Sequence, residues 1–397
     1  MENVYRISAQ LIEKTSTDII RYMFDRIQWE DRLIGIKGAR GVGKTTIMLQ
    51  YIKLKIADRR KALYVSLDNI WFTAHTLVEL ADYHNAHGGE HLFLDEVHRY
   101  PNWSIEVKNI YDSYPDMHIV FTGSSLLEID NSIADLSRRC VIYEMHGLSF
   151  REFLNFEGEH FDKVYSLSEI IKSHYDIAAQ ITAKSKVLPK FEKYLKRGYY
   201  PYYRGSSEIT YLTKVQQVVN TIIDNDIPAV TEIEYASLKK AKQLLVILAE
   251  TVPYTLNIQS LCTMMQIGRN QLMRLFDLLD RAGVIRMIYS EDKGLKQLVK
   301  PEKIVFGNTN IMDALSENVE TGTVRETFFA NQLSLENRIA MPQKGDFLVN
   351  SDYVFEVGGH GKGYKQISGV KGSFVVADGI EIGIDNKIPL WLFGMMY

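Results

Sequence analysis

The sequence predicts an α/β fold with a parallel sheet sandwiched by helices, followed by a helical lid, a winged helix and a small α+β module. Short apolar runs alternate with amphipathic stretches from Leu33 to Ile142, which is typical of βαβ units. Ten of the 26 glycines fall after position 344, and this change of composition indicates a separate C-terminal module. We therefore expect four parts, over residues 1–150, 151–237, 238–306 and 307–397.

The composition excludes several classes of protein. The 397 residues are 46% hydrophobic and 24% charged with a net charge of -3, so neither intrinsic disorder nor global attraction to nucleic acid is expected. Two cysteines, Cys140 and Cys262, are too few for a cysteine-built zinc cluster or a disulfide framework. The first thirty residues lack the pattern of a secretion signal, and no apolar run reaches about 18 residues. The sequence predicts a cytoplasmic protein that does not cross a membrane.

Five apolar runs are expected to form the strands of the sheet: LIGIKG, ALYVSLD, HLFLDE, MHIVFTG and CVIYEM. After the first run, Ile47, Tyr51 and Leu54 recur at helical spacing. This spacing predicts a helix that packs that face on the sheet.

A phosphate-binding loop is predicted between the first strand and this helix. The residues Gly38-Ala39-Arg40-Gly41-Val42-Gly43-Lys44-Thr45 fit the pattern G-x-x-x-x-G-K-[ST]. Glycines let such a loop wrap closely around phosphate with its N–H groups inward, and the N-terminus of the helix, which continues through Thr46, adds positive potential. We expect Lys44 to reach the β and γ phosphates and the Thr45 hydroxyl to bind Mg²⁺. The predicted cofactors are ATP and Mg²⁺.

Two acids, Asp95 and Glu96, end the third apolar run. The carboxyl ends of parallel strands face the same crevice, so both acids should approach the bound triphosphate. Asp95 is expected to be the Mg²⁺ partner, and Glu96 the base that orients and activates water. Paired acids favour hydrolysis over transfer of the phosphoryl group to a bound hydroxyl, so the sequence predicts an ATPase.

Three further residues are candidates for this site. Ser124 follows the fourth strand and could hold the attacking water, although Gly-Ser-Ser is also a common turn sequence. Arg138 and Arg139 precede the fifth strand, and either could neutralise charge on the γ phosphate, in the same chain or across the interface of a homo-oligomer. Solvated surface arginines are an equally good interpretation.

The segments GARGVGKT, HLFLDE, FTGSS and LSRR, followed by GLSFREF, together resemble AAA-type ATPases of bacteria and archaea that carry a C-terminal domain of unknown function. The resemblance implies a P-loop NTPase core, then a lid, a winged helix and a module similar to the restriction-endonuclease fold. It places the phosphate loop at 38–45, the acids at Asp95 and Glu96, the water-sensing residue at Ser124 and an arginine at Arg138 or Arg139.

The C-terminal module contains a second candidate site. If Asn350-Ser351-Asp352 form the loop of a hairpin in DFLVNSDYVFEV, Asp346 stands opposite Glu356, and these like charges repel. A bound cation would relieve the repulsion, and so would a nearby lysine or arginine. Glu326 could supply a third carboxylate.

The arrangement is similar to a nuclease superfamily whose site is an Asp followed by Glu-x-Lys on a hairpin with Mg²⁺. Here Gly358 stands where that lysine is expected, and Lys362 and Lys365 follow in a glycine-rich segment. Two interpretations stay open, an ATP-gated nuclease and a catalytically inactive structural or binding module.

Residues 238–306 read as three helices and a hairpin, the order of a winged helix. The third helix carries the apolar stripe Leu272, Leu275, Phe276 and Leu279. Its polar side carries Arg269, Asn270 and Arg274, which suit a DNA backbone, but Asp277 and Asp280 interrupt this patch. DNA binding by an ATP-switched regulator is therefore an alternative function, and packing against protein is the other interpretation of these residues.

Overall fold

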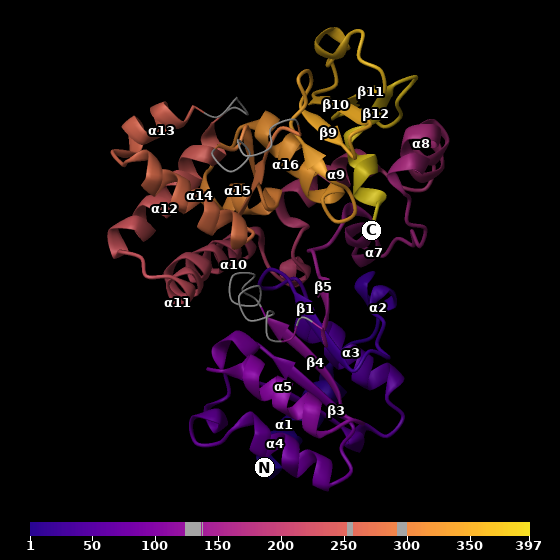
Figure 1. Ribbon diagram of the computed structural model, residues 1–397. Coiled ribbons are helices and arrows are strands. Elements are labelled where there is room, and N and C mark those ends of the chain that lie inside the picture. The colour runs from indigo at the N-terminus through magenta and orange to yellow at the C-terminus, as the bar shows by residue number, and fades with distance from the viewer. Residues whose placement is uncertain (124–135, 137, 252–256, 292–299) are drawn as a thin grey trace. The chain divides into compact units, whose positions relative to one another are not determined.

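The computed structural model describes residues 1–123, 136, 138–251, 257–291 and 300–397 (Figure 1). The chain divides into two compact units, Met1–Gly147 and Leu148–Tyr397. The division falls close to the first expected boundary at residue 150. The three further parts expected from the sequence all lie within the second unit.

The first unit is built on a parallel sheet of five strands in the order β2-β3-β4-β1-β5. The strands are β1 (Leu33–Lys37), β2 (Ala62–Ser66), β3 (His91–Asp95), β4 (His118–Gly123) and β5 (Val141–Glu144). Each coincides with one of the five apolar runs, so the predicted α/β fold is confirmed. This strand order places the carboxyl ends of β1, β4 and β3 side by side.

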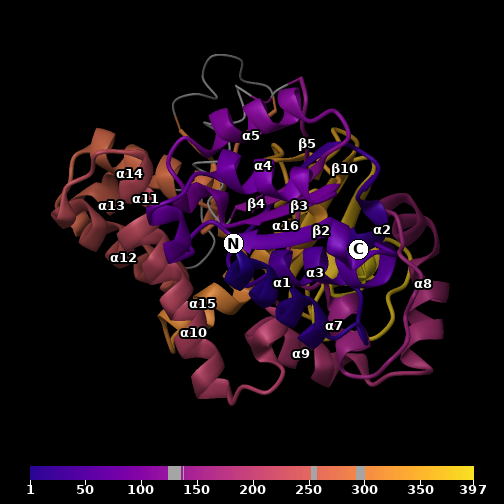
Figure 2. The ribbon, with the colours of Figure 1, turned by 90° about the horizontal axis from the view of Figure 1, so that it is seen from below.

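Helices cover both faces of this sheet. In Figure 2, α4 (Leu77–Ala86) and α5 (Trp103–Ser113) lie on one side of the strands, and α1 (Glu2–Lys14) and α3 (Lys44–Lys55) lie on the other. The short elements are α2 (Met23–Arg26) and the 3-10 turns Arg59–Lys61, Ile70–Thr73 and Val97–Arg99. Helix α3 buries more positions than the single stripe that the sequence predicted. Leu54, which belongs to that stripe, is nevertheless 47% exposed. The expectation that Leu54 packs on the sheet was therefore wrong.

The second unit begins with helices that enclose an aromatic core. They are α7 (Phe150–Phe156), α8 (Leu167–Thr182), α9 (Val187–Arg197), α10 (Glu208–Thr221) and α11 (Ile227–Val230), with a 3-10 turn at Pro201–Tyr203 and a π-helical turn at Ile222–Asp226. Phe191, Tyr194, Tyr200 and Tyr203 are all buried. They are core residues of the second unit.

Three helices and a hairpin follow in the expected order: α12 (Tyr235–Glu250), α13 (Ile258–Met265), α14 (Arg269–Arg281), β6 (Ile285–Ile288) and β7 (Lys303–Phe306), the two strands being antiparallel. The α14 stripe of Leu272, Leu275, Phe276 and Leu279 is buried. This burial confirms that the stripe faces a core.

The last part combines α15 (Thr309–Leu315) and α16 (Thr321–Leu333) with a mixed sheet in the order β12-β11-β10-β9-β8. Its strands are β8 (Ile339–Ala340), β9 (Phe347–Val349), β10 (Tyr353–Gly358), β11 (Ser373–Ala377) and β12 (Lys387–Pro389), with 3-10 turns at Lys365–Ile367 and Leu390–Met395. Tyr353 pairs with Val349, the register that the hairpin pattern predicted.

The first and last segments of this second unit meet. The Phe150 ring on α7 packs edge-on against Trp391, with centroids 6.4 Å apart. The backbone carbonyl of Tyr397 accepts hydrogen bonds from the Ser149 hydroxyl and from Nε of Arg151. The helical and β-rich parts therefore share one core.

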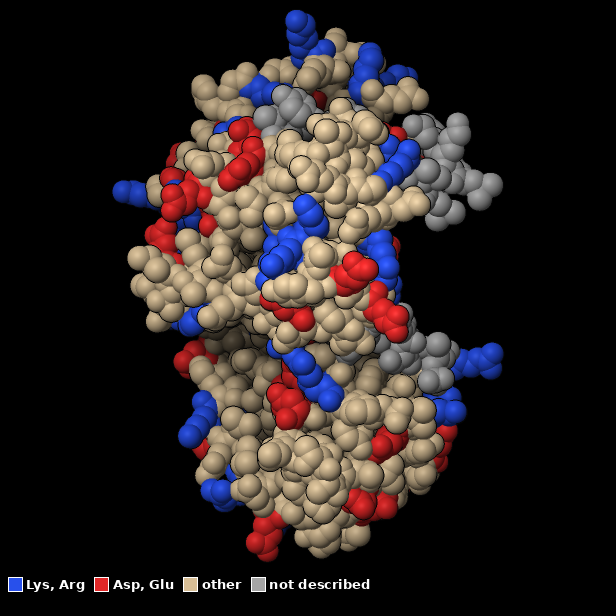
Figure 3. All heavy atoms as spheres, turned by 90° about the vertical axis from the view of Figure 1, so that its left-hand side faces the viewer, with Lys and Arg blue, Asp and Glu red and all other residues tan. Residues whose placement is uncertain are grey.

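Charged residues of both signs are interspersed on the face drawn in Figure 3, without one continuous basic surface. This distribution agrees with the small net charge of -3. Among the helices of the described residues, none is long and apolar enough to cross a membrane.

Candidate active site

The phosphate loop connects β1 to the first turn of α3 and depends on its glycines. Gly41 and Gly43 have φ values of 81° and 107°, a region that residues with a Cβ rarely adopt. At Gly38, an added Cβ would lie 2.3 Å from the carbonyl oxygen of Met145. Glycine is therefore required at Gly38 by close packing and at Gly41 and Gly43 by backbone conformation.

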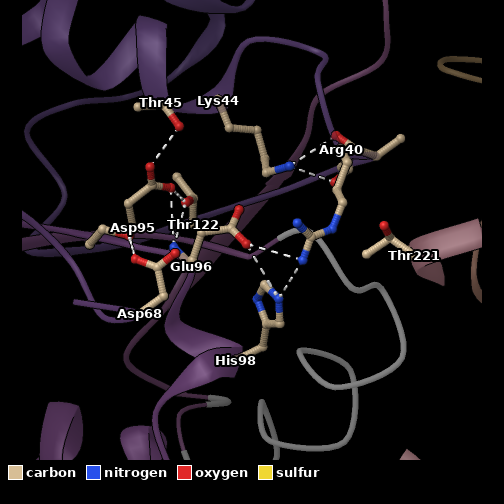
Figure 4. A network of polar contacts seen from close by, with 12 residues as sticks. Arg40, Lys44, Thr45, Asp68, Asp95, Glu96, His98, Thr122 and Thr221 are labelled. Atoms are coloured by element: carbon tan, nitrogen blue, oxygen red, sulfur yellow. Dashed lines mark hydrogen bonds and ion pairs between the residues drawn. The ribbon is translucent and has the colours of Figure 1, made fainter. Parts of the chain in front are cut away.

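The Lys44 side chain turns back over this loop (Figure 4). Its Nζ donates to the carbonyl oxygens of Gly38 at 2.7 Å and Ala39 at 2.9 Å. Lys44 is 5% exposed. The loop thus holds a buried ammonium group at the N-terminus of a helix, where an anion is favoured.

Asp95 is the most heavily hydrogen-bonded acid of the site. Its Oδ2 accepts from the Thr45 hydroxyl at 2.6 Å and from the Tyr64 hydroxyl at 2.8 Å. Its Oδ1 accepts from the Thr122 hydroxyl and from the backbone N–H of Glu96 at 3.1 Å. Burial, followed by the Asp95 charge, raises the pKa of Tyr64 well above its usual range, so Tyr64 stays a donor. These four donors fix the position of the Asp95 carboxyl group at the end of β3.

Glu96 adopts a left-handed conformation with φ of 53°. Its Oε2 lies 3.5 Å from Nη2 of Arg40 in the phosphate loop and 3.4 Å from Nε2 of His98 (Figure 4). Burial and the neighbouring Arg40 charge lower the pKa of His98 to about 3. His98 is therefore neutral at physiological pH, while the Arg40 guanidinium keeps a positive charge beside the Glu96 carboxylate.

The oxygen donors near the loop suit a magnesium ion. Mg²⁺ prefers hydroxyl, carboxylate and phosphate oxygens, and Thr45 and Asp95 present a hydroxyl and a carboxylate within 2.6 Å of each other. The residues present therefore fit the expected ion.

The other predicted residues are placed as follows. Ala39, Arg40 and Gly41 lie along the loop and Thr46 is exposed in the first turn of α3, whereas the Val42 side chain is buried at 0% exposure. Val42 can thus serve a ligand only through its backbone. Ser124 lies outside the described residues.

The two arginines before β5 have different surroundings. Arg138 is exposed. Arg139 forms a bidentate pair with Asp112 of α5, with Nε–Oδ1 and Nη2–Oδ2 distances of 2.9 and 3.1 Å. Arg139 is therefore held by Asp112, whereas Arg138 is exposed to solvent.

Thr122 and Tyr64 contact Asp95 but were not among the predicted site residues. Thr122 is completely buried at the end of β4, two positions before the serine that the sequence pattern favoured. Each of the two is a polar side chain in a buried strand next to the strand that carries the acids, and this pattern could have identified both. No such pattern in the sequence indicated His98.

The second candidate site contains the three predicted carboxylates and two lysines. The buried Lys303 Nζ donates to Oε2 of Glu326 at 2.7 Å and to Oδ1 of Asp346 at 3.4 Å. Lys362 forms an ion pair with Glu356. Burial raises the pKa of Glu326 to about 7, and the Lys303 charge opposes this shift.

Lysines relieve the charge repulsion that the hairpin register predicted. A Cβ added to Gly358 would lie 2.6 Å from Cδ of Lys362, so the Lys362 side chain fills the space above the position where the nuclease pattern has its lysine. Lys303 was not anticipated. Within the part of the chain that the structure describes, no group of three or more His, Cys, Asp or Glu side chains is arranged to hold a metal ion.

The candidate DNA-binding residues of α14 are not equally available. Arg269 and Asn270 are exposed. Arg274 donates from Nη2 to the carbonyl of Glu232 at 2.6 Å and to the Thr231 hydroxyl at 3.0 Å. Asp280 accepts from the N–H of Met287 at 2.8 Å. Arg274 and Asp280 therefore have structural partners within the second unit.

The phosphate loop lies at the carboxyl ends of the parallel strands, together with the Thr45–Asp95 pair and Glu96. This arrangement defines a P-loop ATPase of the AAA type. Residues 30–154 match the family described as AAA domain. Residues 188–321 match a domain of unknown function (DUF8612). The chain belongs to the same family as the uncharacterized protein MJ1637 of Methanocaldococcus jannaschii. The two are 30% identical over 407 residues, an alignment that covers 94% of this chain and 85% of that protein.

Two solved structures are also similar. One is AMPPCP-bound DnaA from Aquifex aeolicus, with 12% identity, a TM-score of 0.26 and coverage of 70% of this chain and 88% of that chain. The other is C. elegans PCH-2, with 13% identity, a TM-score of 0.26 and coverage of 71% and 66%.

Proposed function

We propose that the protein binds ATP with Mg²⁺ at the phosphate loop, hydrolyses it, and couples the nucleotide state to rearrangement of the second unit. The observation that carries the proposal is the contact between Thr45 and Asp95, with Glu96 next in the chain. This contact joins the phosphate loop to the strand that carries the paired acids, which are the parts that hydrolysis needs.

Each residue has a defined task in this proposal. Lys44 exchanges its two carbonyl acceptors for phosphate oxygens, and the N–H groups of the loop surround the phosphates. Thr45 and Asp95 would hold Mg²⁺, which neutralises charge on the phosphates when bound. Glu96 accepts a hydrogen bond from the attacking water and then its proton. Arg40 and His98 keep the Glu96 carboxylate oriented.

Two substitutions test this assignment with purified protein. The Lys44→Ala variant should lose nucleotide binding, because Lys44 supplies the positive charge with which the loop attracts phosphate. Glu96→Gln should bind ATP yet turn it over at least about 100-fold more slowly, since it cannot accept the proton of water. Lys55→Ala, at an exposed position of the same helix, is the matched control. A wild-type protein without affinity for Mg²⁺-ATP would overturn the proposal.

For the second unit we propose a winged helix over 238–306 and an endonuclease-like module over 307–397 that is catalytically inactive. The pairing of Lys303 with Glu326 and Asp346 supports the inactive form, because an ammonium group lies between two carboxylates that a metal would need. Metal-dependent DNA cleavage by the wild type that is lost in Asp346→Ala would contradict it.

Three finer points belong to the same proposal. We assign the exposed Arg138 as the residue that acts on ATP in a neighbouring subunit, which requires a homo-oligomer.

DNA binding as an alternative function would depend on Arg269 and Asn270, the exposed polar residues of α14, and an electrophoretic shift lost in Arg269→Ala would support it. Cys140 and Cys262 are both free thiols, in keeping with a cytoplasmic location.

A further inference from the structure

Arg21 is a buried arginine that follows α1 and lies beneath the phosphate loop. It is 5% exposed. Its Nη1 donates to the carbonyl oxygen of Val42 at 2.5 Å, and its Nη2 donates to the carbonyl oxygens of His146 at 2.9 Å and Gly147 at 2.8 Å. One guanidinium group therefore holds two segments that are more than 100 positions apart in the chain.

The first of these segments is the part of the loop that should contact phosphate. In a trans peptide the C=O and the following N–H point in opposite directions. Because Arg21 holds the carbonyl of Val42, the N–H of Gly43 is directed away from Arg21. The contact thus fixes the orientation of a loop N–H group before any nucleotide binds.

The second segment is the end of the first unit. Gly147 is its last residue, and Leu148 begins the second unit. Any displacement of His146 and Gly147 therefore moves the covalent connection between the two units.

Other contacts join the same two segments. The N–H of Met145 donates to the carbonyl of Lys37, just before the loop, at 2.8 Å. Gly38, the first residue of the loop, packs so closely on Met145 that a Cβ there would lie 2.3 Å from the Met145 carbonyl oxygen. The loop thus contacts residues 145–147 directly at one end and through Arg21 at the other.

We propose that Arg21 is a positioning residue for the phosphate loop, and that it transmits the nucleotide-dependent position of this loop to residues 145–147 at the end of the first unit. The proposal deepens the ATPase function and rests on it for its nucleotide-dependent part. The bridge made by Arg21 itself exists without nucleotide.

The experiment measures backbone hydrogen exchange in segments 38–46 and 143–150, without nucleotide and with Mg²⁺-ADP. In Arg21→Ala we expect faster exchange in both segments without nucleotide. Mg²⁺-ADP should slow exchange in both segments of the wild type but only in 38–46 of the variant. The Kd for Mg²⁺-ADP should rise by about tenfold or more, the effect of losing the charge-assisted hydrogen bond from Arg21 to the carbonyl of Val42 in the loop.

Arg32→Ala is the matched control, since Nη2 of Arg32 also donates to two carbonyl oxygens, those of Tyr111 at 2.9 Å and Tyr114 at 3.0 Å. It should leave exchange in 38–46 and 143–150 unchanged. Arg21→Lys, which keeps the charge but not the planar fork, serves if the alanine variant does not fold, and should show the same two-segment effect in weaker form. Added guanidinium should partly restore Arg21→Ala.

Two results would overturn the proposal: unchanged exchange in 143–150 in both Arg21 variants, or equal loss of protection in Arg32→Ala. If the wild type binds no nucleotide, the ATPase proposal fails separately, because the exchange measured without nucleotide still tests the bridge.

Discussion

The Thr45 hydroxyl donates a hydrogen bond of 2.6 Å to Oδ2 of Asp95, across 50 positions of the chain. The two oxygen atoms proposed to hold Mg²⁺ are thus already adjacent. Thr45 and Asp95 would together hold Mg²⁺, which would supply positive charge to the phosphates, while Tyr64 and Thr122 hold the Asp95 carboxylate through their own hydrogen bonds.

Thr122→Val should slow ATP turnover. The substitution keeps the side-chain shape but leaves Asp95 without one of its donors, at a cost of about 1–3 kcal/mol. Because Asp95 is proposed to hold the Mg²⁺ beside the reacting phosphate, we expect kcat to fall by roughly tenfold or more, with a smaller effect on KM. Steady-state kinetics check this, with Thr122→Ser as the control that retains the hydroxyl. Equal kcat values for the valine and serine variants would refute the role of Thr122.

Gly38→Ala should abolish nucleotide binding. A methyl group at this position would lie 2.3 Å from the Met145 carbonyl oxygen, and backbone atoms cannot give way as a flexible side chain does. Isothermal titration with Mg²⁺-ATP measures the loss. Gly268→Ala is the matched control, since an added Cβ there meets nothing within 4 Å and the variant should bind as the wild type does.

Arg138→Ala and Arg139→Ala should separate the two arginines. Arg139 pairs with Asp112 at a partly exposed position, so its loss should cost at most about 1 kcal/mol of stability and leave turnover nearly unchanged. Arg138→Ala should lower turnover in a way that depends on protein concentration, because the proposed contact is between subunits. Turnover that falls only in Arg139→Ala would reverse the assignment.

Glu326→Gln should change how stability depends on pH. Burial raises the pKa of Glu326 in the folded protein to about 7 from 4.5. The stabilising contribution of the protonated group is present in full below about pH 4.5 and is lost as the pH rises through about 7. Since one pKa unit is worth about 1.4 kcal/mol, ionisation costs the wild type up to about 3 kcal/mol over this interval.

The glutamine variant has no such loss, so its melting temperature relative to the wild type should increase from pH 5 to pH 8. Scanning calorimetry at the two pH values measures the difference. Glu317→Gln, at an exposed position, should show no such change. A constant difference between Glu326→Gln and the wild type would contradict the raised pKa.

Much of the first unit, and one hairpin of the second, could be predicted from local pattern. The strands, the phosphate loop and the Asp95–Glu96 pair follow from apolar runs and fixed spacings, and the register that pairs Tyr353 with Val349 follows from a short turn. Lys303 and Arg21 could not be predicted, because their partners come from distant segments that only the tertiary fold brings together. The prediction that Leu54 packs on the sheet was wrong, because a helix that buries many of its positions need not bury every member of one apolar stripe.

The contact between α7 and residues 390–397 also affects how the protein is made. Ser149 and Tyr397 are 248 positions apart, and at about 5–20 residues per second the ribosome needs about 12–50 s to deliver the second after the first. The first unit can fold during this interval. Helix α7, with its buried Phe150 and Phe153, has to wait for its last partners, so the nascent chain carries exposed aromatic surface that chaperones recognise.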